Sequence, residues 1–393
     1  MFAGLARFRL QQRLGRILCS SGPGAHALCG VILVLIVAAA GVSHASDNWD
    51  TVGYVASMYA AEGHRGDDLR DETYADIKKS VDAHSYQNII GTNDYQTEVY
   101  RDAEALRQQL PFYSIRIAYI ETARLFVSLG TTHTGALRYT AIFYGGLCVL
   151  MILAILAATG LPATLCIPVS ITAGLLPLVQ LNTPDVVAAA ASLAVLYLLI
   201  QNRHLWGLAF VVALPFIRTD FVLLSIIVAC YVGIVNRKIV LPLASAAASV
   251  AVLEWIDISH GNYGYLTILN FTFFHLTPYP ADMAISPNPG DYVRLYLRAT
   301  AEFITLPIFY IYVIGSIAAL VLRKINESFL RLSNTYLIGV VFLIAHFMLF
   351  PAYFPRYFFF VKVMDFLVLA ALCASGVRIL WPETRPGHAR VAG

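Results

Sequence analysis

Apolar positions along the chain gather into ten runs that are separated by short polar segments and by two long polar ones. A helix needs about 20 apolar residues to cross the hydrocarbon of a bilayer, and somewhat fewer where the bilayer thins. The pattern therefore predicts an all-α polytopic membrane protein with about ten transmembrane helices. The runs cover residues 27–46, 136–158, 164–181, 186–201, 205–217, 219–235, 239–254, 300–322, 333–350 and 357–377.

Residues 205–235 are long enough to form one helix or two. Arg203 precedes this stretch and Arg237 follows it, so a single crossing would leave basic residues on both sides of the membrane. A hairpin that turns at 218–220 keeps both on one side, as the cytoplasmic preference of basic residues requires. We therefore expect two helices.

Basic residues also orient the other runs. With the amino terminus inside, both termini are cytoplasmic, as tails 1–26 and 378–393, and the long polar segments 47–135 and 255–299 lie outside. Only Glu327 and Glu383 of the 24 acidic residues then fall on the inner side. Against them stand 13 of the 27 Lys and Arg residues: Arg7, Arg9, Arg13, Arg16, Arg203, Arg237, Lys238, Arg323, Lys324, Arg331, Arg378, Arg385 and Arg390.

The first run has a competing interpretation as a signal peptide, with a cleavage site after Ser43-His44-Ala45. The basic segment before it is long for a signal peptide. The apolar run itself reaches the length of a membrane anchor, so we expect an anchor.

Composition supports a membrane protein and excludes several other classes. Hydrophobic residues make up 58% of the 393 residues and charged residues 13%, whereas soluble proteins average about 45–50% and about 25%. We expect one membrane domain spanning 1–393. A net charge of +3 does not indicate a nucleic-acid partner. The six cysteines show no CxxC spacing, which argues against disulfide frameworks and zinc sites.

The two long outer segments differ in character. The first is polar up to Leu110, and its continuation, 111–126, carries Arg116 and Arg124 among apolar residues at helical spacing. We expect an interfacial helix there that starts at Pro111. The second segment contains proline-rich stretches at 277–280 and 286–290 among many aromatic residues, which predicts a partly ordered loop on the membrane surface.

Short outer turns carry charged residues at the ends of the predicted helices. Ionisable groups at this depth are costly unless they face one another or a wet cavity, so together they indicate one polar pocket. The alternative is that each is an interfacial anchor or a helix cap. The residues are Asp185, Arg218, Asp220 and Arg356. Lys362 and Asp365, inside the last run, are predicted to form a structural ion pair.

The segment 47–56 follows the first run directly and contains Asp47 and Asp50. A carboxylate just beyond a rigid helix, at the water boundary, can keep a raised pKa and approach a hydroxyl group held at the interface. The alternative for Asp50 is a helix N-cap.

Short motifs follow one another on the outer side of this topology. They are Asp50 with Tyr54 and Ala56, Pro111-Phe112-Tyr113, Leu129-Gly130 followed by Ala136-Leu137-Arg138, Thr183-Pro184-Asp185-Val186-Val187, Ile217-Arg218-Thr219-Asp220, and Arg356-Tyr357. In this order they resemble the GT-C superfamily of membrane glycosyltransferases. The resemblance is to the branch of protein mannosyltransferases and bacterial lipid A aminoarabinose transferases.

The resemblance implies an inverting transfer of a sugar from a polyprenyl-phosphate donor to a hydroxyl group of a glycan, lipid or protein acceptor. The reaction would take place on the non-cytoplasmic face of a bacterial plasma (inner) membrane. Phosphate is a good leaving group, so one carboxylate base and cations on the phosphate suffice.

The roles that follow are assigned by residue type. Asp50 is the expected base and Asp185 is expected to orient the acceptor or a cation. Arginine binds phosphate oxygens bidentately. The expected substrate-binding residues are Asp47, Tyr54, Arg116, Arg218, Asp220, Arg356 and Tyr357. We expect no cofactor, and the residues do not decide whether a divalent metal takes part.

The alternative function is a transporter or flippase for a lipid-linked or small anionic substrate. Transporters usually show two related halves and helices broken near the midplane, and neither is evident in the sequence. A non-enzymatic assembly factor is a third reading, but it would not need carboxylates and arginines in so many outer turns.

Overall fold

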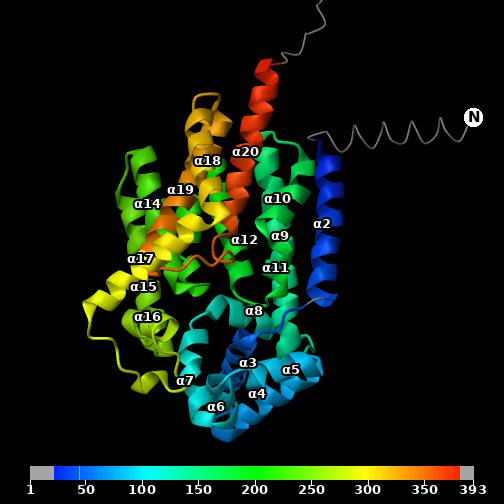
Figure 1. Ribbon diagram of the computed structural model, residues 1–393. Helices are drawn as coiled ribbons and strands as arrows, with labels where there is room; N and C mark the ends of the chain where they lie inside the picture. The colour runs from blue at the N-terminus through cyan, green and yellow to red at the C-terminus, as the bar shows by residue number, and fades with distance from the viewer. Residues whose placement is uncertain (1–21, 44, 381–393) are drawn as a thin grey trace, which may run out of the picture.

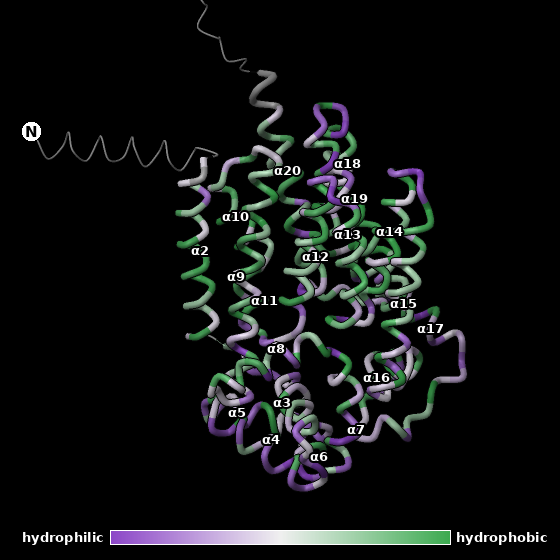
Figure 2. Tube along the Cα trace, turned by 180° about the vertical axis from the view of Figure 1, so that it is seen from behind, coloured by the Kyte–Doolittle hydropathy of each residue, from purple (hydrophilic) through white to green (hydrophobic). Residues whose placement is uncertain are grey.

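The computed structural model describes residues 22–43 and 45–380, and in this range it is built of helices without strands (Figure 1). An apolar bundle is covered at one end by a smaller, mostly hydrophilic layer of helices (Figure 2). We call residues 49–128 the cap layer and the adjacent end of the bundle the cap end. The predicted all-α class is confirmed. The predicted tails 1–26 and 378–393 fall for the most part outside the described residues.

The bundle contains the helices expected of a helical membrane protein. Within the described residues, five helices are long and apolar enough to cross a membrane, or six if one bent pair counts as a single crossing. The bundle helices are α2 (Pro23–Ser43), α9 (His133–Thr159), α10 (Cys166–Ala173), α11 (Leu175–Gln180), α12 (Asp185–Ile200), α13 (His204–Val211), α14 (Val222–Asn236), α15 (Val240–His260), α18 (Pro307–Leu322), α19 (Glu327–Leu349) and α20 (Phe359–Leu380). A 3-10 turn, η1 (Ala163–Leu165), precedes α10.

The apolar run 164–181 is not the single helix that we expected. It is divided into α10 and α11 at Gly174, which adopts a left-handed conformation with φ of 93°. Glycine takes this conformation without a steric penalty and ends helices for that reason. Neither of the two short helices could cross a bilayer alone.

Residues 205–235 form two helices, as the hairpin prediction expects. Helix α13 and the 3-10 turn η2 (Leu214–Phe216) lead to Arg218, and η3 (Thr219–Phe221) leads into α14. The two helices pack side by side, and Ser225 Oγ donates a hydrogen bond to the Val211 carbonyl at 2.7 Å.

The predicted run 300–322 is interrupted as well. Helix α17 (Pro289–Thr305) meets α18 at a bend of 74°. Leu306 between them is extended, because a residue before proline avoids the helical region, and Pro307 then starts α18. The run is therefore two helices joined at a bend and not one continuous helix.

The cap layer consists of short helices, and polar side chains cap the first turn of four of them. Asn48, Asp82, Asn93 and Asp102 each accept a hydrogen bond from a backbone N–H group in the first turn that follows. The helices are α3 (Trp49–Glu62), α4 (Gly66–Ser80), α5 (Ala83–Gly91), α6 (Asp94–Arg101), α7 (Ala103–Tyr113) and α8 (Ile117–Ser128).

The prediction that a helix starts at Pro111 is wrong. Asp102 caps α7, so this helix begins at Ala103 and contains Pro111 near its end. Proline removes one helical hydrogen bond, and α7 ends two residues later at Tyr113. The amphipathic segment instead forms α8 from Ile117 onwards.

The second long segment, 255–299, is more ordered than the expected surface loop. Helix α15 continues to His260, and α16 (Tyr265–Phe273) and α17 take up much of the rest. The proline-rich stretch around η4 (Pro280–Asp282) is irregular, and it contacts the cap layer. Tyr279 Oη donates to Asp102 Oδ2 at 2.6 Å, and Gln109 Nε2 donates to the Pro278 carbonyl at 2.8 Å.

The segments that connect the bundle helices meet at the cap end. The Ser46 N–H group donates to the Gln180 carbonyl at 2.8 Å, and Tyr119 Oη in α8 donates to the Asn182 carbonyl at 2.5 Å. Arg116 reaches Thr219 of the 218–220 turn. The outer turns singled out in the sequence therefore lie together, against the cap layer.

Candidate active site

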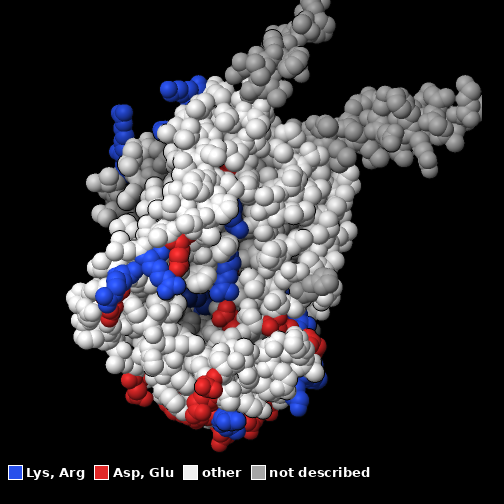
Figure 3. Space-filling view, in the orientation of Figure 1, with Lys and Arg blue, Asp and Glu red and all other residues white. Residues whose placement is uncertain are grey.

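Side chains from several separate stretches of the chain form one charged cluster at the cap end. Figure 3 shows basic and acidic side chains beside one another at a hollow between the bundle and the cap layer. Most of the predicted site residues belong to the cluster. They are Asp50, Asp185, Arg218, Asp220, Arg356 and Tyr357.

The buried half of the cluster is built around Arg218, which is 5% exposed. Its guanidinium donates to Asp185 and, through Nε and Nη2, to both carboxylate oxygens of Asp220 at 3.1 and 2.9 Å. The Tyr357 ring lies 3.8 Å from Arg218 Cζ and closes the remaining side. Arg218 is thus held by two carboxylates and an aromatic face, an arrangement that offsets the cost of burying its charge.

The more exposed half of the cluster is built around Arg356, whose side chain is 27% exposed. Its Nη1 lies 3.4 Å from Asp50 Oδ2, and its Nε lies 3.1 Å from Asp185 Oδ2. Arg356 therefore bridges the two carboxylates that the sequence singled out as catalytic. The contact to Asp50 is long for a hydrogen bond, so this pair is loosely held.

Asp50 lies in the first turn of α3, next to Arg356. The helix cap is Asn48, whose side chain accepts from the Asp50 N–H group at 2.9 Å, so Asp50 itself is not the cap. Its carboxylate is 28% exposed and accepts from Tyr113 Oη at 3.4 Å. Burial by the surrounding side chains raises the pKa of Asp50, although Arg356 and Tyr113 oppose the change.

Tyrosine rings form the wall of the site next to Asp50. Tyr54, 5% exposed, makes edge-on contacts with Tyr113 and Tyr119, with ring centroids 5.1 and 5.0 Å apart. Gly53 allows Tyr113 to lie against α3, since a Cβ atom at this position would overlap the Tyr113 ring. Burial raises the pKa of Tyr54, so its phenol stays protonated.

Two predicted residues lie at the border of the cluster. Arg116, at the start of α8, donates to Thr219 Oγ1 at 3.3 Å and has no carboxylate partner among the described residues. Asp47 is held by Arg138 at 2.5 Å and by Asn182 at 3.1 Å. It fastens the segment after α2 to α9 and to the 181–185 turn.

His346 belongs to the cluster and was not among the predicted site residues. It lies in the last turn of α19, is 1% exposed, and its Nε2 pairs with Asp220 Oδ2 at 2.9 Å. The other ring nitrogen, Nδ1, is buried without a hydrogen-bond partner among the described residues. Its position as a polar residue inside the apolar run 333–350 could have identified it from the sequence. Tyr113 was noted only as part of a motif.

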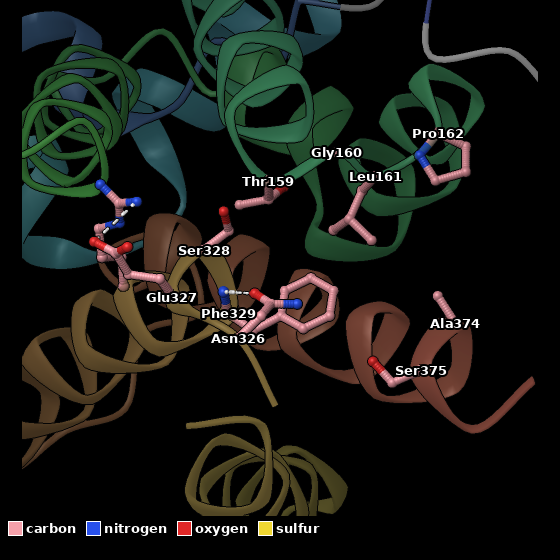
Figure 4. A pocket seen from close by; sticks show the side chains of 11 residues that line it. Thr159, Gly160, Leu161, Pro162, Asn326, Glu327, Ser328, Phe329, Ala374 and Ser375 are labelled. Carbon is pink, nitrogen blue, oxygen red and sulfur yellow. Dashed lines mark hydrogen bonds and ion pairs between the residues drawn. The ribbon is translucent and has the colours of Figure 1, made fainter. Parts of the chain in front are cut away.

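A separate cavity of about 630 Å³ lies at the opposite end of the bundle, where α9 and α20 end and α19 begins (Figure 4). Its polar side chains are already used locally. Asn326 caps α19, Glu327 pairs with Arg331 at 3.4 Å, and the Thr159 and Ser375 hydroxyl groups donate to carbonyls of their own helices. This cavity offers no convergent reactive groups.

Within the described part of the chain, no three His, Cys, Asp or Glu side chains are grouped as ligands for a metal ion. Comparison of the chain with family models, with curated proteins and with solved structures found no match in any of the three. The site is therefore interpreted from its own geometry. It combines a carboxylate of raised pKa with a partly exposed guanidinium at the boundary between an apolar bundle and a polar layer, where it could accept a proton and bind an anion.

Proposed function

We propose that the protein is a glycosyltransferase of the GT-C type, which moves a sugar from a polyprenyl-phosphate donor to an acceptor hydroxyl group with inversion. The observation that supports it most is the pairing of Asp50 with Arg356 at the cap end. A proton acceptor and a phosphate-binding cation lie side by side there. A lipid carrier can present its phosphate at this depth while its tail stays among the apolar helices.

In the proposed reaction Asp50 takes the proton of the acceptor hydroxyl group. The acceptor oxygen forms a bond to the anomeric carbon, and the bond between that carbon and the phosphate oxygen breaks. The electron pair leaves with the polyprenyl phosphate, whose charge Arg356 stabilises, with Arg116 as the second cation. Asp185 orients Arg356, and Arg218 with Asp220 and Tyr357 fixes Asp185.

Donor binding also prepares the base in this scheme. Without donor, Arg356 pairs with Asp50 and so lowers its proton affinity. A phosphate group that draws the guanidinium away would remove this stabilisation of the carboxylate. Asp50 then becomes a stronger base only when the donor is in place.

The proposal includes a topology of about ten crossing segments with both termini cytoplasmic and the cap layer outside, in the inner membrane of a bacterium. Its support is the asymmetry of basic residues and the meeting of all the predicted outer turns at the cap end. Gly91→Cys and Asn236→Cys, in a background without native cysteines, test it with an impermeant thiol reagent in intact cells. Labelling should occur at position 91 only, and labelling at position 236 alone would reverse the orientation.

Mass spectrometry of the cell envelope tests the transferase itself. A strain that lacks the gene should lose one sugar modification from its envelope and accumulate the polyprenyl-phosphate-linked sugar. The wild-type gene should restore the modification and the Asp50→Asn gene should not. An envelope that is unchanged by the deletion, in glycans and in lipids, would contradict the proposal.

A transporter of an anionic, lipid-linked substrate is the second candidate, and one observation favours it. The segment 166–180 is broken at Gly174, and Lys362 Nζ lies 3.4 Å from the position of a Cβ atom on this glycine. Broken helices beside ionisable groups are typical of transport pathways. A reconstituted transporter would move the lipid-linked sugar across proteoliposomes without an acceptor, and the Asp50→Asn variant would still do so.

A further inference from the structure

Another carboxylate, Asp365, is buried in the first half of α20. It has no exposed surface, and neither carboxylate oxygen has a hydrogen-bond partner among the described residues. The ion pair that we expected between Asp365 and Lys362 is not formed. Lys362 faces Gly174 between α10 and α11, whereas Asp365 faces α18 and α19.

Gly315 of α18 makes room for the Asp365 carboxylate. A Cβ atom at position 315 would overlap Asp365 Oδ1 and would come within 2.9 Å of Tyr336 Oη. The Tyr336 hydroxyl is therefore the polar group next to the carboxylate. It donates its own proton to the Tyr312 carbonyl at 3.0 Å, which leaves its oxygen free to accept one.

The other titratable groups around Asp365 are neutral tyrosines. Tyr312 on α18, Tyr336 on α19 and Tyr353 before α20 surround it, and the Tyr312 and Tyr353 hydroxyl groups lie 3.1 Å apart. Lys362, on its own helix, forms no ion pair with it. An ionised carboxylate without a cation or hydrogen-bond donor would be very costly in this apolar setting.

We propose that Asp365 is a proton-binding site enclosed by α18, α19 and α20. The carboxylic acid holds the proton and donates it in a hydrogen bond to Tyr336 Oη. A hard metal cation takes about six or more oxygen ligands. The neutral oxygens next to Tyr336, Ser316 Oγ and the Tyr312 carbonyl, are already engaged with each other at 2.7 Å. A proton needs only one acceptor and fits what the site offers.

The proton site has a consequence for the helix that carries Arg356. Helix α20 begins at Phe359, three residues after Arg356, and its contact with α18 includes the fit of Asp365 against Gly315. A neutral Asp365 lets α20 stay against α18, whereas an ionised one would push the two helices apart. The proposal itself does not depend on the transferase function.

Infrared spectroscopy of the purified protein in lipid tests it through the carbonyl stretching band of a protonated carboxylic acid. We expect the wild-type protein to show this band at neutral pH, the Asp365→Asn variant to lose it, and the Lys362→Met variant to keep it. If the wild-type protein lacked the band and Lys362→Met created it, Asp365 would be an ionised partner of Lys362 and the proposal would be overturned.

A second measurement decides the matter if Asp365→Asn does not fold. The Asp50→Asn protein lacks the cap-layer carboxyl group whose pKa burial raises, so a band that remains in it at neutral pH supports a proton on Asp365. A spectrum of the Asp50→Asn protein without any protonated-acid band would overturn the proposal.

Discussion

Two arginines lie side by side in the candidate site, and they differ in how completely their guanidinium groups are paired and buried. Arg218 is 5% exposed, donates to two carboxylates and stacks on Tyr357. Arg356 has a side chain that is 27% exposed and a contact of 3.4 Å to Asp50. The guanidinium of Arg218 is already enclosed by its partners. The guanidinium of Arg356 is partly exposed, and its long contact with Asp50 could be exchanged for a ligand.

This difference divides the site into two parts. We call Arg218 with Asp185, Asp220 and Tyr357 the framework half, and Arg356 with Asp50 the reactive edge. From the sequence both arginines were expected to bind the donor phosphate. We therefore propose that Arg218 holds Asp185 and Asp220 in place and that Arg356 is the arginine that binds the phosphate. Residues of the same type in neighbouring turns thus have different roles, because one is saturated with partners and the other is not.

The largest effect is expected from Arg218→Met. Removing one member of a buried ion pair costs about 3–5 kcal/mol, because the carboxylates of Asp185 and Asp220 are left buried without their cation. The melting temperature of the purified protein in detergent should fall by many degrees. Arg356→Met makes the same chemical change at the exposed arginine and serves as the control. Equal losses of stability in both variants would erase the distinction between them.

Arg356→Met should act on the donor instead. The protein should stay folded, while the affinity for the polyprenyl-phosphate donor falls by about 2–5 kcal/mol, the usual cost of truncating one partner of a desolvated charge pair. Arg356→Lys should recover only part of this, since an ammonium group cannot bind phosphate bidentately. Titration of donor into the purified variants measures the effect, and unchanged affinity in folded Arg356→Met would remove this residue from the site.

The smallest effect is expected from His346→Phe. The ring volume is kept, but Asp220 loses the contact with His346 Nε2 while it keeps Arg218, so the cost should be about 1 kcal/mol in unfolding free energy. Donor affinity should change little, because His346 supports the framework half. A loss of donor affinity as large as that of Arg356→Met would place His346 at the reactive edge.

The sequence sufficed to predict that the charged turns meet, but not that His346 joins them. Asp185, Arg218, Asp220 and Arg356 all stand at the same ends of apolar runs, and runs of similar length bring these ends to one level. Asp50 follows the first run and reaches the same level. The turn at 218–220 followed from the basic residues on either side of the hairpin, and it lies where they predicted it.

Other features of the fold and the site depend on tertiary contacts or backbone conformation, which the local sequence pattern does not predict. Gly174 lies within an apolar run, and only its left-handed backbone reveals the break there. Asp102 caps α7 and so overrides Pro111 as a helix start. Spacing alone suggested a bond between Lys362 and Asp365, but the two side chains face different neighbouring helices. Which arginine is saturated also follows only from tertiary packing.

The central claim is that Asp50 serves catalysis and not stability. Its contribution to protein stability and its contribution to activity should change in opposite directions with pH. A pKa raised by folding means that Asp50 stabilises the protein at low pH and that this contribution is lost as pH rises through the raised pKa. Activity needs the ionised base, so it should instead be lost as pH falls through the pKa that Asp50 has with the donor in place.

The most direct test therefore measures sugar transfer and melting temperature on one preparation of Asp50→Asn, beside the wild-type protein at neutral pH. The amide keeps the shape and cannot ionise. Transfer should fall by about 10²- to 10⁴-fold, the contribution of a positioned proton acceptor, while the melting temperature stays level or rises. Near-normal turnover, or a melting temperature that falls together with activity, would contradict the assignment of Asp50 as the base.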